Sequence, residues 1–511
     1  MTKDLDLILT PEEAFKPDML LKKAAYKAGI REKSITDFRF LRRSIDARRR
    51  DVKINARIRL YIGEKPSNIY EKVSFKEADD SKRAVIVGAG PAGLFAALTL
   101  LEYGVKPIIL ERGKDVHSRR LDTARLSREG ILNPESNYAY GEGGAGAFSD
   151  GKLYTRSVKR GNVGRILSIF CQHGADESII SDTHPHIGTD VLPRVIENIR
   201  KTIIAYGGEV HFDTKVVSLI KHEDETVGAV TERGEEFRGP VILATGHSAK
   251  DVYRFLLEDG YELESKDTAI GVRLEHSQHL IDQIQYHNKN GRGLYLPPAS
   301  YSFVTQVNGR GVYSFCMCPG GVVVPSSTEY GYQNVNGMSG SKRAGLYGNS
   351  AMVVQLRCDD VPGSGPLKML SFIEDLERKA FIPGFKAPSN RMLDFVEGRI
   401  NDSLPKTTYP CGIEPRLLDD ILPPVVSYSL REGFKKFGAL TDGRFLTNDA
   451  LMLGVETRTS SPVRIVRDGQ MRQGKGLYPS GEGAGYAGGI VSAALDGTES
   501  AMHLLEEMNE R

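Results

Sequence analysis

Apolar positions recur with two different periods along the chain, and the points where the period changes predict most of its elements. A short β-branched run at residues 84–87 predicts a buried strand. The apolar spacing of residues 91–101 then has the period of a helix, and a second apolar run at residues 107–110 ends at Glu111. The segment therefore predicts a strand, a tight turn, a helix and a second strand that closes with an acid.

The residues before this segment predict a separate αβ module at residues 1–70. Its expected strand, helix and two alternating runs lie near residues 5–9, 17–28, 35–46 and 52–62. Residues 71–81 are charged, and we predict a linker with few apolar anchors. The module should then be separable from the rest of the chain.

The remainder of the chain does not repeat this pattern. After an irregular stretch and a glycine-rich segment, one helix and four strands are expected near residues 190–206, 209–212, 216–222, 226–231 and 240–249. Residues 265–440 then alternate strand-like runs with Pro and Gly breaks, and a helix is expected near residues 366–381. From residue 476 the pattern predicts a strand, a glycine loop and an amphipathic helix.

Three glycines occupy the first predicted turn, and each has its own physical reason. Gly88 would make the turn, Gly90 would let the backbone approach a phosphate, and Gly93 would let helix and strand pack closely. A diphosphate would lie at the helix N-terminus beside Pro91 and Ala92, where N–H groups and the helix dipole favour negative charge.

The acid at the end of the second strand completes the unit. Glu111 is placed to accept both ribose hydroxyls of an adenosine, with Arg112 next to it. The stretch therefore predicts an ADP-binding unit, and the alternative is a purely structural glycine turn.

Composition limits the class of protein. The chain has 511 residues, enough for about three domains, and a net charge of +2. Its start carries acids where a secretory signal needs apolar residues, and no apolar run reaches about 18 residues. Five cysteines without a CxxC pair favour a reducing compartment and suggest no metal site. We expect a soluble cytoplasmic protein without membrane contact.

Four motifs follow one another in a characteristic order: GAGPAG with Glu111, VHFDTKVVSLI, VILATG and LYPSGEGAGYAGGI. This order resembles that of the two-dinucleotide-binding-domain flavoproteins, the glutathione-reductase-like FAD fold. The resemblance implies FAD and an α/β fold: a FAD-binding Rossmann domain at residues 82–264 and 441–511, with an inserted α+β substrate domain at residues 265–440. It implies further cofactor contacts at Val216, Ala244, Thr245, Gly246, Gly481, Glu482, Gly489 and Ile490.

A closer resemblance rests on GEGGAGAFSDGKL, GVRLEH, YSFCMCPGG, LPKTTYPCG and GVETRTSSPVRI. Together these motifs resemble a family of largely uncharacterised FAD-dependent dehydrogenases and FAD-binding proteins that also carry a short N-terminal αβ module. The resemblance covers almost the whole chain. It supports FAD strongly and says little about the substrate.

The glycine-rich segment 141–146 also fits the GxGxxG pattern. Because no strand precedes it and no acid closes a unit after it, we reject a second, NAD-binding site there. The related folds imply instead that Gly143, Gly144 and Ala145 lie against the diphosphate and the isoalloxazine. Ser149 and Lys152 would then face the flavin, where a cation stabilises the reduced ring; a solvated lysine is the alternative.

The segment FCMCPGG carries the strongest chemical candidates of the middle domain. We predict that Cys316 and Cys318 alternate on a strand and point to opposite faces, which disfavours a disulfide between them. One thiol would face the flavin as a nucleophile or redox relay, and the alternative is a pair of small buried side chains. His276 and Arg458 are weaker candidates for acid and anion-binding roles, and a structural ion pair explains Glu456 and Arg458 equally well.

These features predict an FAD-dependent oxidoreductase that transfers hydride between the flavin and a small-molecule substrate. NAD(P)H or an external carrier would reduce the flavin. Residues 1–83 hold 21 Lys and Arg against 14 Asp and Glu, so an RNA-modifying enzyme is an alternative, with phosphate contacts at Arg48, Arg49, Arg50, Lys53, Arg57 and Arg59. A non-catalytic flavin-binding protein is another alternative.

Overall fold

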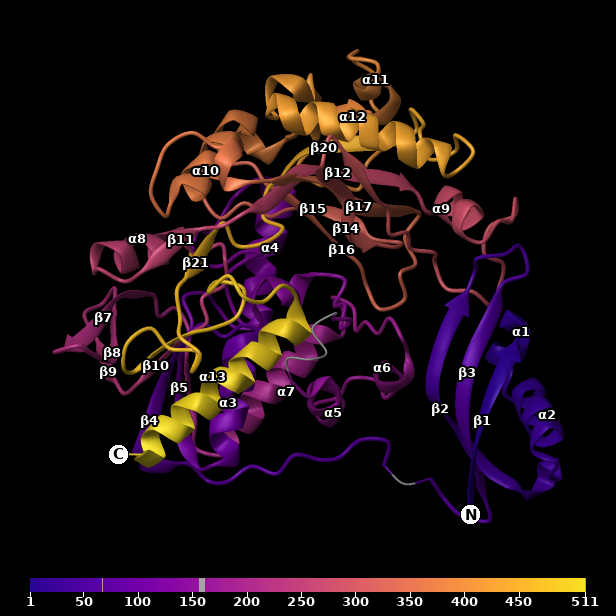
Figure 1. Cartoon of the computed structure of the whole chain (residues 1–511), viewed down its shortest axis with the longest axis horizontal. Helices are drawn as coiled ribbons and strands as arrows, with labels where there is room; N and C mark the ends of the chain where they lie inside the picture. Colours follow the sequence, from indigo (N-terminus) through magenta and orange to yellow (C-terminus); the bar gives the residue numbers. More distant parts are fainter. Residues whose placement is uncertain (67, 156–160, 511) are drawn as a thin grey trace.

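The strands predicted at residues 84–87 and 107–110 belong to a parallel sheet at the centre of one half of the molecule (Figure 1). The structure is a computed structural model and describes residues 1–66, 68–155 and 161–510. Five parallel strands lie in the order β22-β10-β4-β5-β6. They are β4 (Asp79–Val87), β5 (Val105–Leu110), β6 (Glu209–His211), β10 (Val241–Leu243) and β22 (Leu477–Pro479). The last strand of the chain thus pairs beside β10, so both ends of this domain build one sheet.

Helices cover this sheet because its central strands are apolar on both faces. The helices of this half are α3 (Pro91–Glu102), α4 (Val116–Glu129), α5 (Val163–Gln172), α6 (Ser178–Ser181), α7 (Leu192–Ala205), α8 (Lys250–Glu258) and α13 (Ile490–Glu510). The helices α3 and α13 meet at backbone distance, since a Cβ on Gly497 would lie 2.0 Å from the Ala92 oxygen. A separate antiparallel sheet consists of β7 (Val216–His222), β8 (Glu225–Thr231) and β9 (Glu236–Arg238).

The inserted domain is a mixed seven-stranded sheet in the order β13-β14-β17-β12-β20-β18-β19. The strands are β12 (Thr268–Ser277), β13 (Val304–Val307), β14 (Arg310–Cys318), β17 (Tyr347–Leu356), β18 (Ala387–Arg391), β19 (Ile413–Pro415) and β20 (Leu451–Glu456). Its further elements are β15 (Val322–Pro325), β16 (Val335–Met338), α9 (Gln278–Gln285), α10 (Lys368–Ala380), α11 (Met392–Val396) and α12 (Pro424–Ala439). A short pair, β11 (Leu263–Ser265) and β21 (Val463–Ile465), lies where the chain enters and leaves this domain.

The two faces of the seven-stranded sheet differ. One face is apolar and packs under α12 in a large core that includes Val272 and Phe434. Successive strand residues point to opposite faces, so Arg273 and Glu275 lie on the other face, which is turned toward the parallel sheet (Figure 1). This face therefore carries both polar and apolar side chains, because Ala351, opposite Arg273, belongs to a small apolar cluster with Ala269 and Val353.

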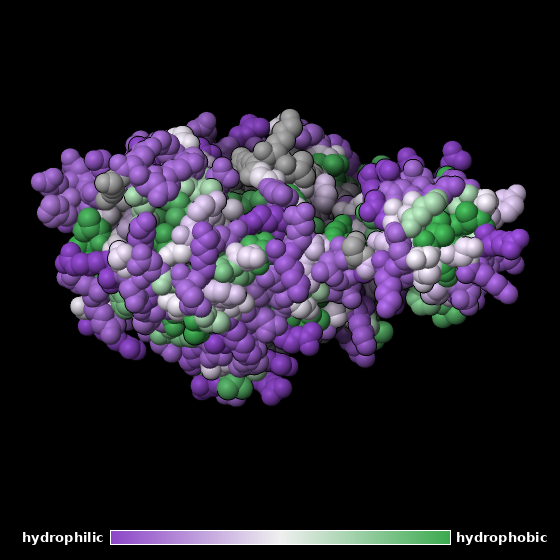
Figure 2. Space-filling view, turned by 90° about the horizontal axis from the view of Figure 1, so that it is seen from below, coloured by the Kyte–Doolittle hydropathy of each residue, from purple (hydrophilic) through white to green (hydrophobic). Residues whose placement is uncertain are grey.

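Residues 1–62 form a three-stranded antiparallel sheet, β1-β3-β2, with its helices on one face. The elements are β1 (Thr2–Leu9), α1 (Pro11–Phe15), α2 (Pro17–Ala28), β2 (Ile35–Asp46) and β3 (Lys53–Ile62). The Arg43 guanidinium pairs with Asp182 beside α6 at 2.8 and 3.1 Å, and Val52 packs into the core of the inserted domain. Figure 2 shows the module as a lobe at one side of the molecule.

The prediction that residues 71–81 form a linker with few apolar anchors is wrong. Within residues 71–81, Val73 exchanges two backbone hydrogen bonds of 2.9 Å with the Gln172 side chain, and Phe75 packs edge-on against Tyr206 at 5.7 Å. The segment therefore has apolar anchors on the parallel-sheet domain. The expectation of an easily separable module loses its basis.

Three other expectations need correction. The boundary at residue 440 lies too early, because β20 pairs with β12 and β18 in the middle of the inserted sheet. The stretch expected to be irregular contains α4, whose many charged residues hide its helical period. The strand expected at residues 240–249 ends at Leu243, and α12 was missed among the strand-like runs.

Candidate functional site

The first glycine loop has the geometry that a diphosphate cradle requires. Gly88 has φ +106°, and a Cβ there would lie 2.5 Å from the Ala244 oxygen. A Cβ on Gly93 would lie 1.9 Å from the Gly88 oxygen, whereas a Cβ on Gly90 would meet nothing closer than the Gly144 Cα at 3.9 Å. Gly90 is the N-cap of α3 and no side chain caps this end. Gly88 and Gly93 are thus required by packing, and Gly90 leaves room for an anion beside N–H groups that no side chain caps.

Glu111 organises this loop through its carboxylate. Its Oε2 accepts a hydrogen bond from Ala89 N at 2.8 Å, and its Oε1 accepts from Gly113 N at 2.9 Å and Gly141 N at 3.0 Å. The side chain is buried. Glu111 therefore connects the two glycine loops. From the sequence, this residue was assigned only to ribose binding.

The second glycine loop packs directly on the first. Gly143 N donates to the Ala89 oxygen at 2.8 Å, and a Cβ on Gly144 would lie 3.2 Å from the Gly90 Cα. Gly144 begins a short 3-10 helix, η2 (Gly144–Phe148), which contains Ala145. In the described chain the element that precedes this loop is α4, not a strand.

Arg119 holds the second loop and was missed from the sequence. The side chain is fully buried, and burial lowers its pKa to about 10. Its guanidinium donates at 2.7–3.2 Å to five backbone oxygens, those of Asn137, Tyr138, Gly141, Glu142 and Gly144. A lone arginine in a polar helix gives no sequence signal for this role.

The C-terminal segment reaches the same place. Gly481 has φ +76°, and its N–H donates to Asp496 Oδ2 at 2.7 Å. The Glu482 carboxylate accepts from Gly489 N and lies 3.1 Å from His247 Nδ1. Burial raises the pKa of Glu482, but these bonds outweigh burial and leave its pKa below the usual value. Sequence reasoning missed Asp496 as the acid that holds this turn.

The remaining predicted cofactor residues lie around these loops. Arg112 forms a bidentate pair with Asp251 at 3.0 and 2.8 Å and lies 4.3 Å above the ring centre of Tyr140. Ala244, Thr245 and Gly246 follow β10 directly, and Val216 begins β7. Pro91 and Ala92 form the first turn of α3, and Ile490 begins α13.

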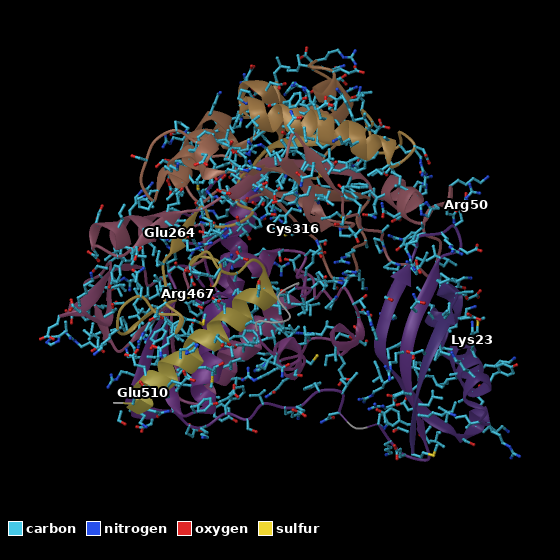
Figure 3. All side chains as sticks on the ribbon, viewed as in Figure 1. Lys23, Arg50, Glu264, Cys316, Arg467 and Glu510 are labelled. Atoms are coloured by element: carbon cyan, nitrogen blue, oxygen red, sulfur yellow. The ribbon has the colours of Figure 1, made fainter. Side chains whose placement is uncertain are left out.

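Lys152, Cys316 and Cys318 meet at one point, although they come from two domains. The Lys152 ammonium donates to the Met317 oxygen, between the two cysteines. Arg273 is fully buried and donates from Nη2 to the Cys316 oxygen at 2.8 Å. In Figure 3, Cys316 lies between the inserted sheet and the parallel-sheet domain.

The argument that strand alternation points Cys316 and Cys318 to opposite faces is wrong. Residues two apart in a regular strand share a face. Here a register shift between Phe315 and Cys318 and a φ of +44° at Cys316 interrupt the strand. Cys316 is exposed toward the space between the domains, and Cys318 is buried. Burial among the surrounding groups still raises the pKa of Cys316 to about 12, while Lys152 opposes the shift.

Family models match three segments of the chain. An FAD binding domain matches residues 82–238, the C-terminal domain of an FAD-dependent protein matches residues 267–459, and a domain of unknown function matches residues 1–61. An "Uncharacterized protein" of Clostridium beijerinckii is 39% identical over 96% of both chains. The chain belongs to the family of this clostridial protein, and its cofactor is FAD. Its fold is an α/β FAD-binding fold.

Solved structures of flavoproteins show only a distant likeness to this FAD-binding chain. They include CtdE in complex with FAD (11% identity, TM-score 0.34, 84% of this chain and 85% of that chain). The tetracycline destructase Tet(55) has 13% identity, a TM-score of 0.36 and 84% coverage of each chain. The flavin-dependent brominase Bmp2 has 13% identity, a TM-score of 0.37, and 84% and 79% coverage. No helix in the described part of the FAD protein is long and apolar enough to cross a membrane.

The other chemical candidates of this FAD protein have structural partners. His276 is buried, stacks on Phe445 and lies 2.9 Å from its oxygen, and burial lowers its pKa to about 4. Glu456 pairs with Arg273 at 3.0 Å, not with Arg458. The Ser149 hydroxyl bonds within its own loop, to the Gly146 oxygen at 2.8 Å.

Arg458 forms a bidentate pair with Glu377, with both distances 2.9 Å. In the N-terminal module, Arg59 pairs with Asp4 at 2.7 and 3.0 Å, and Arg48 pairs with Asp46. These pairs reduce the number of arginines that are open to a phosphate partner.

Proposed function

We propose that the protein is an FAD-dependent oxidoreductase that transfers hydride between the flavin and a small-molecule substrate. One observation carries the proposal: the inserted sheet contacts the chain just after the second glycine loop, where the Lys152 ammonium donates to the Met317 oxygen. A substrate held between the inserted sheet and the flavin would touch residues of both domains. Such placement at a domain interface is usual for ligand sites.

The residues present fit FAD. Gly90 leaves open space at the uncapped N-terminus of α3, where a diphosphate binds favourably. Glu111 and Arg112 would lie at the ribose, and the N-terminus of α13 would point to the flavin. Bound FAD supplies the redox chemistry, while the chain orients the ring, excludes water and holds a positive charge at Lys152.

The glutathione-reductase-like topology of the FAD domain remains part of this proposal, supported by the parallel sheet and the three-stranded sheet β7-β8-β9. In the described residues a single five-stranded parallel sheet occurs. NAD(P)H, or an external carrier, would then reach the flavin from the substrate side. The substrate itself would use the same entrance.

The proposal is tested on the purified full-length protein. It should be yellow, and heat should release FAD rather than FMN, as chromatography of the pigment distinguishes. NADH, NADPH and a chemical carrier such as dithionite-reduced viologen are then added anaerobically while flavin absorbance is followed. Bleaching by a donor followed by reoxidation with an added acceptor supports an oxidoreductase. A flavin that resists every donor would instead indicate a non-catalytic flavin-binding protein.

A further inference from the structure

The hairpin formed by β2 and β3 is strongly basic. Between Ile35 and Ile62 it holds nine Lys and Arg residues against three Asp residues. The whole chain has a net charge of +2, so the rest of the chain has a small excess of acids. The positive charge of this protein is therefore concentrated on two strands and on the turn between them, where Figure 3 labels Arg50.

The register of the two strands places four arginines on one face of the module's sheet. Alternate residues of β3, such as Ile58, pack with α2 in the core of the module. The residues between them therefore lie on the opposite face. On that face Arg39 lies directly opposite Arg59. Arg42 lies directly opposite Arg57 in the same way. We call this surface the arginine face.

These arginine pairs are unfavourable for the sheet, because like charges directly opposite each other destabilise it. Asp4 on β1 compensates one pair, since it bonds to Arg59 at 2.7 and 3.0 Å. In the next row Asp6 lies on one side of Arg57 and Arg42 lies on the other. Both of these arginines are exposed. The face therefore keeps an excess of positive charge toward β2, which a bound anion would relieve.

The kind of cation indicates the kind of anion. A guanidinium binds phosphate through two parallel hydrogen bonds and stacks on flat rings, whereas a lysine ammonium does neither. A membrane surface instead favours lysines together with exposed apolar side chains. The two central rows of the arginine face consist of charged residues, Asp4–Arg59–Arg39 and Asp6–Arg57–Arg42. The face therefore suits a phosphodiester chain better than a lipid surface.

An exposed aromatic pair lies beside the β2 edge of this face. Thr183 N donates to the oxygen of Arg43, the residue after Arg42, at 3.1 Å. The next residue, His184, has its ring centre 5.1 Å from that of Tyr154. Both rings are exposed, Tyr154 with 53% of its surface. Proteins hold the bases of single-stranded RNA by stacking them on such rings.

We propose that the arginine face binds single-stranded RNA, with Arg42 and Arg57 on its phosphates and Tyr154 against a base. This binding is a second function that goes beyond the redox reaction proposed above, since it uses no residue of the FAD cradle. The pair of Arg43 with Asp182 would hold the two parts of the RNA site together.

Fluorescence anisotropy on the full-length, FAD-loaded protein tests the proposal. The probe is a short fluorescein-labelled single-stranded RNA of mixed sequence, titrated at several salt concentrations. For the double variant Arg42→Gln/Arg57→Gln we expect RNA affinity to fall at least about tenfold. The slope of log affinity against log salt should become shallower by about 1.4, because each lost phosphate contact removes ~0.7 for a single strand. The control Arg120→Gln/Arg233→Gln changes two exposed arginines outside the module and should keep wild-type affinity and slope.

Two further measurements separate RNA binding from a structural role. The double variant should unfold at the wild-type temperature or above it, because opposed like charges do not stabilise a sheet. Tyr154→Ala should weaken RNA binding about fivefold or more through lost stacking, without changing the salt slope.

Equal RNA affinity for the wild type and the Arg42→Gln/Arg57→Gln variant would overturn the proposal. Wild-type protein that binds phosphatidylserine vesicles and not RNA would also overturn it, in favour of a membrane surface. Flavin content and bleaching by electron donors report on the proposed redox function separately, and they should be the same in the wild type and the double variant.

Discussion

The proposed diphosphate end of the candidate site is shaped mainly by close backbone packing, whereas its proposed flavin end is held by side chains from two domains. At the diphosphate end, the three glycines of the motif lie within residues 88–93. Neighbouring backbone fills the space around Gly88 and Gly93. At the flavin end, Lys152 and Arg273 come from segments far apart in sequence and converge on one bulge. The first end is specified locally, and the second exists only once the domains have folded together.

This difference predicts different kinds of failure. A substitution at the diphosphate end should act through steric overlap and should cost folding or cofactor binding outright. A substitution at the flavin end should act through charge and reactivity and should leave folding largely intact.

The largest expected effect distinguishes two glycines of one motif. Gly93→Ala would place a Cβ 1.9 Å from the Gly88 oxygen, so we expect misfolded protein or a loss of several kcal/mol, beyond the ~1–3 kcal/mol of ordinary overpacking. Gly90→Val faces open space and should fold but lack FAD. Thermal unfolding and absorbance at the flavin band separate the two outcomes. A yellow, fully loaded Gly90→Val protein would place the diphosphate elsewhere.

Arg119 gives the next largest effect. Arg119→Gln leaves most of five backbone oxygens without a donor, and we expect a loss of about 3 kcal/mol or more in unfolding free energy. Its neighbour Arg120 is exposed on the same helix, so Arg120→Gln should change stability by less than ~0.5 kcal/mol. Urea unfolding measures both variants. Equal stabilities would mean that the second loop holds its shape without Arg119.

The contrast also explains what could be predicted from the sequence. Local sequence was enough to predict the glycine turn, the helix α3 and the position of Glu111, because the residues involved are neighbours in the chain. The bounds of α2 were also predicted, because they coincide with the ends of its apolar helical pattern. Arg119, Arg273 and Asp496 act on backbone far from them in sequence, and no local pattern marks such partners. The strand interruption at Cys316 was missed because a bulge depends on the register of the neighbouring strand.

Glu111 should have a moderate effect on cofactor retention. Glu111→Gln keeps the shape of the side chain but loses charge-assisted hydrogen bonds from backbone N–H groups, at a cost of about 1.5–3 kcal/mol. We expect FAD affinity to fall by at least tenfold, as measured by fluorescence titration of the apoprotein. Glu129→Gln, at the exposed end of α4, is the control. An unchanged FAD affinity for Glu111→Gln would mean that the two glycine loops keep their cofactor-binding shape without the carboxylate charge.

The smallest effect is a shift in reactivity at the flavin end. The pKa of Cys316 is raised to about 12, so its thiolate is scarce at neutral pH. In FAD-free protein, the rate of Cys316 alkylation by iodoacetamide should rise about tenfold per pH unit from pH 8 to pH 11, without the plateau near pH 9 of an ordinary cysteine. Lys152→Met should lower the rate, because the ammonium favours the thiolate. A plateau near pH 9 would contradict the raised pKa.

The anchoring of the N-terminal module has a mechanical consequence for this site. Arg43 ties the module to the parallel-sheet domain beside α6, and Val52 ties it to the core of the inserted domain. Because the module is attached to both domains, it restricts their movement relative to each other. We therefore expect substrates to enter by local movement of side chains and loops rather than by hinged opening of the two domains. The first sixty residues would then limit how far the two domains can separate, and so the size of substrate that can reach the flavin.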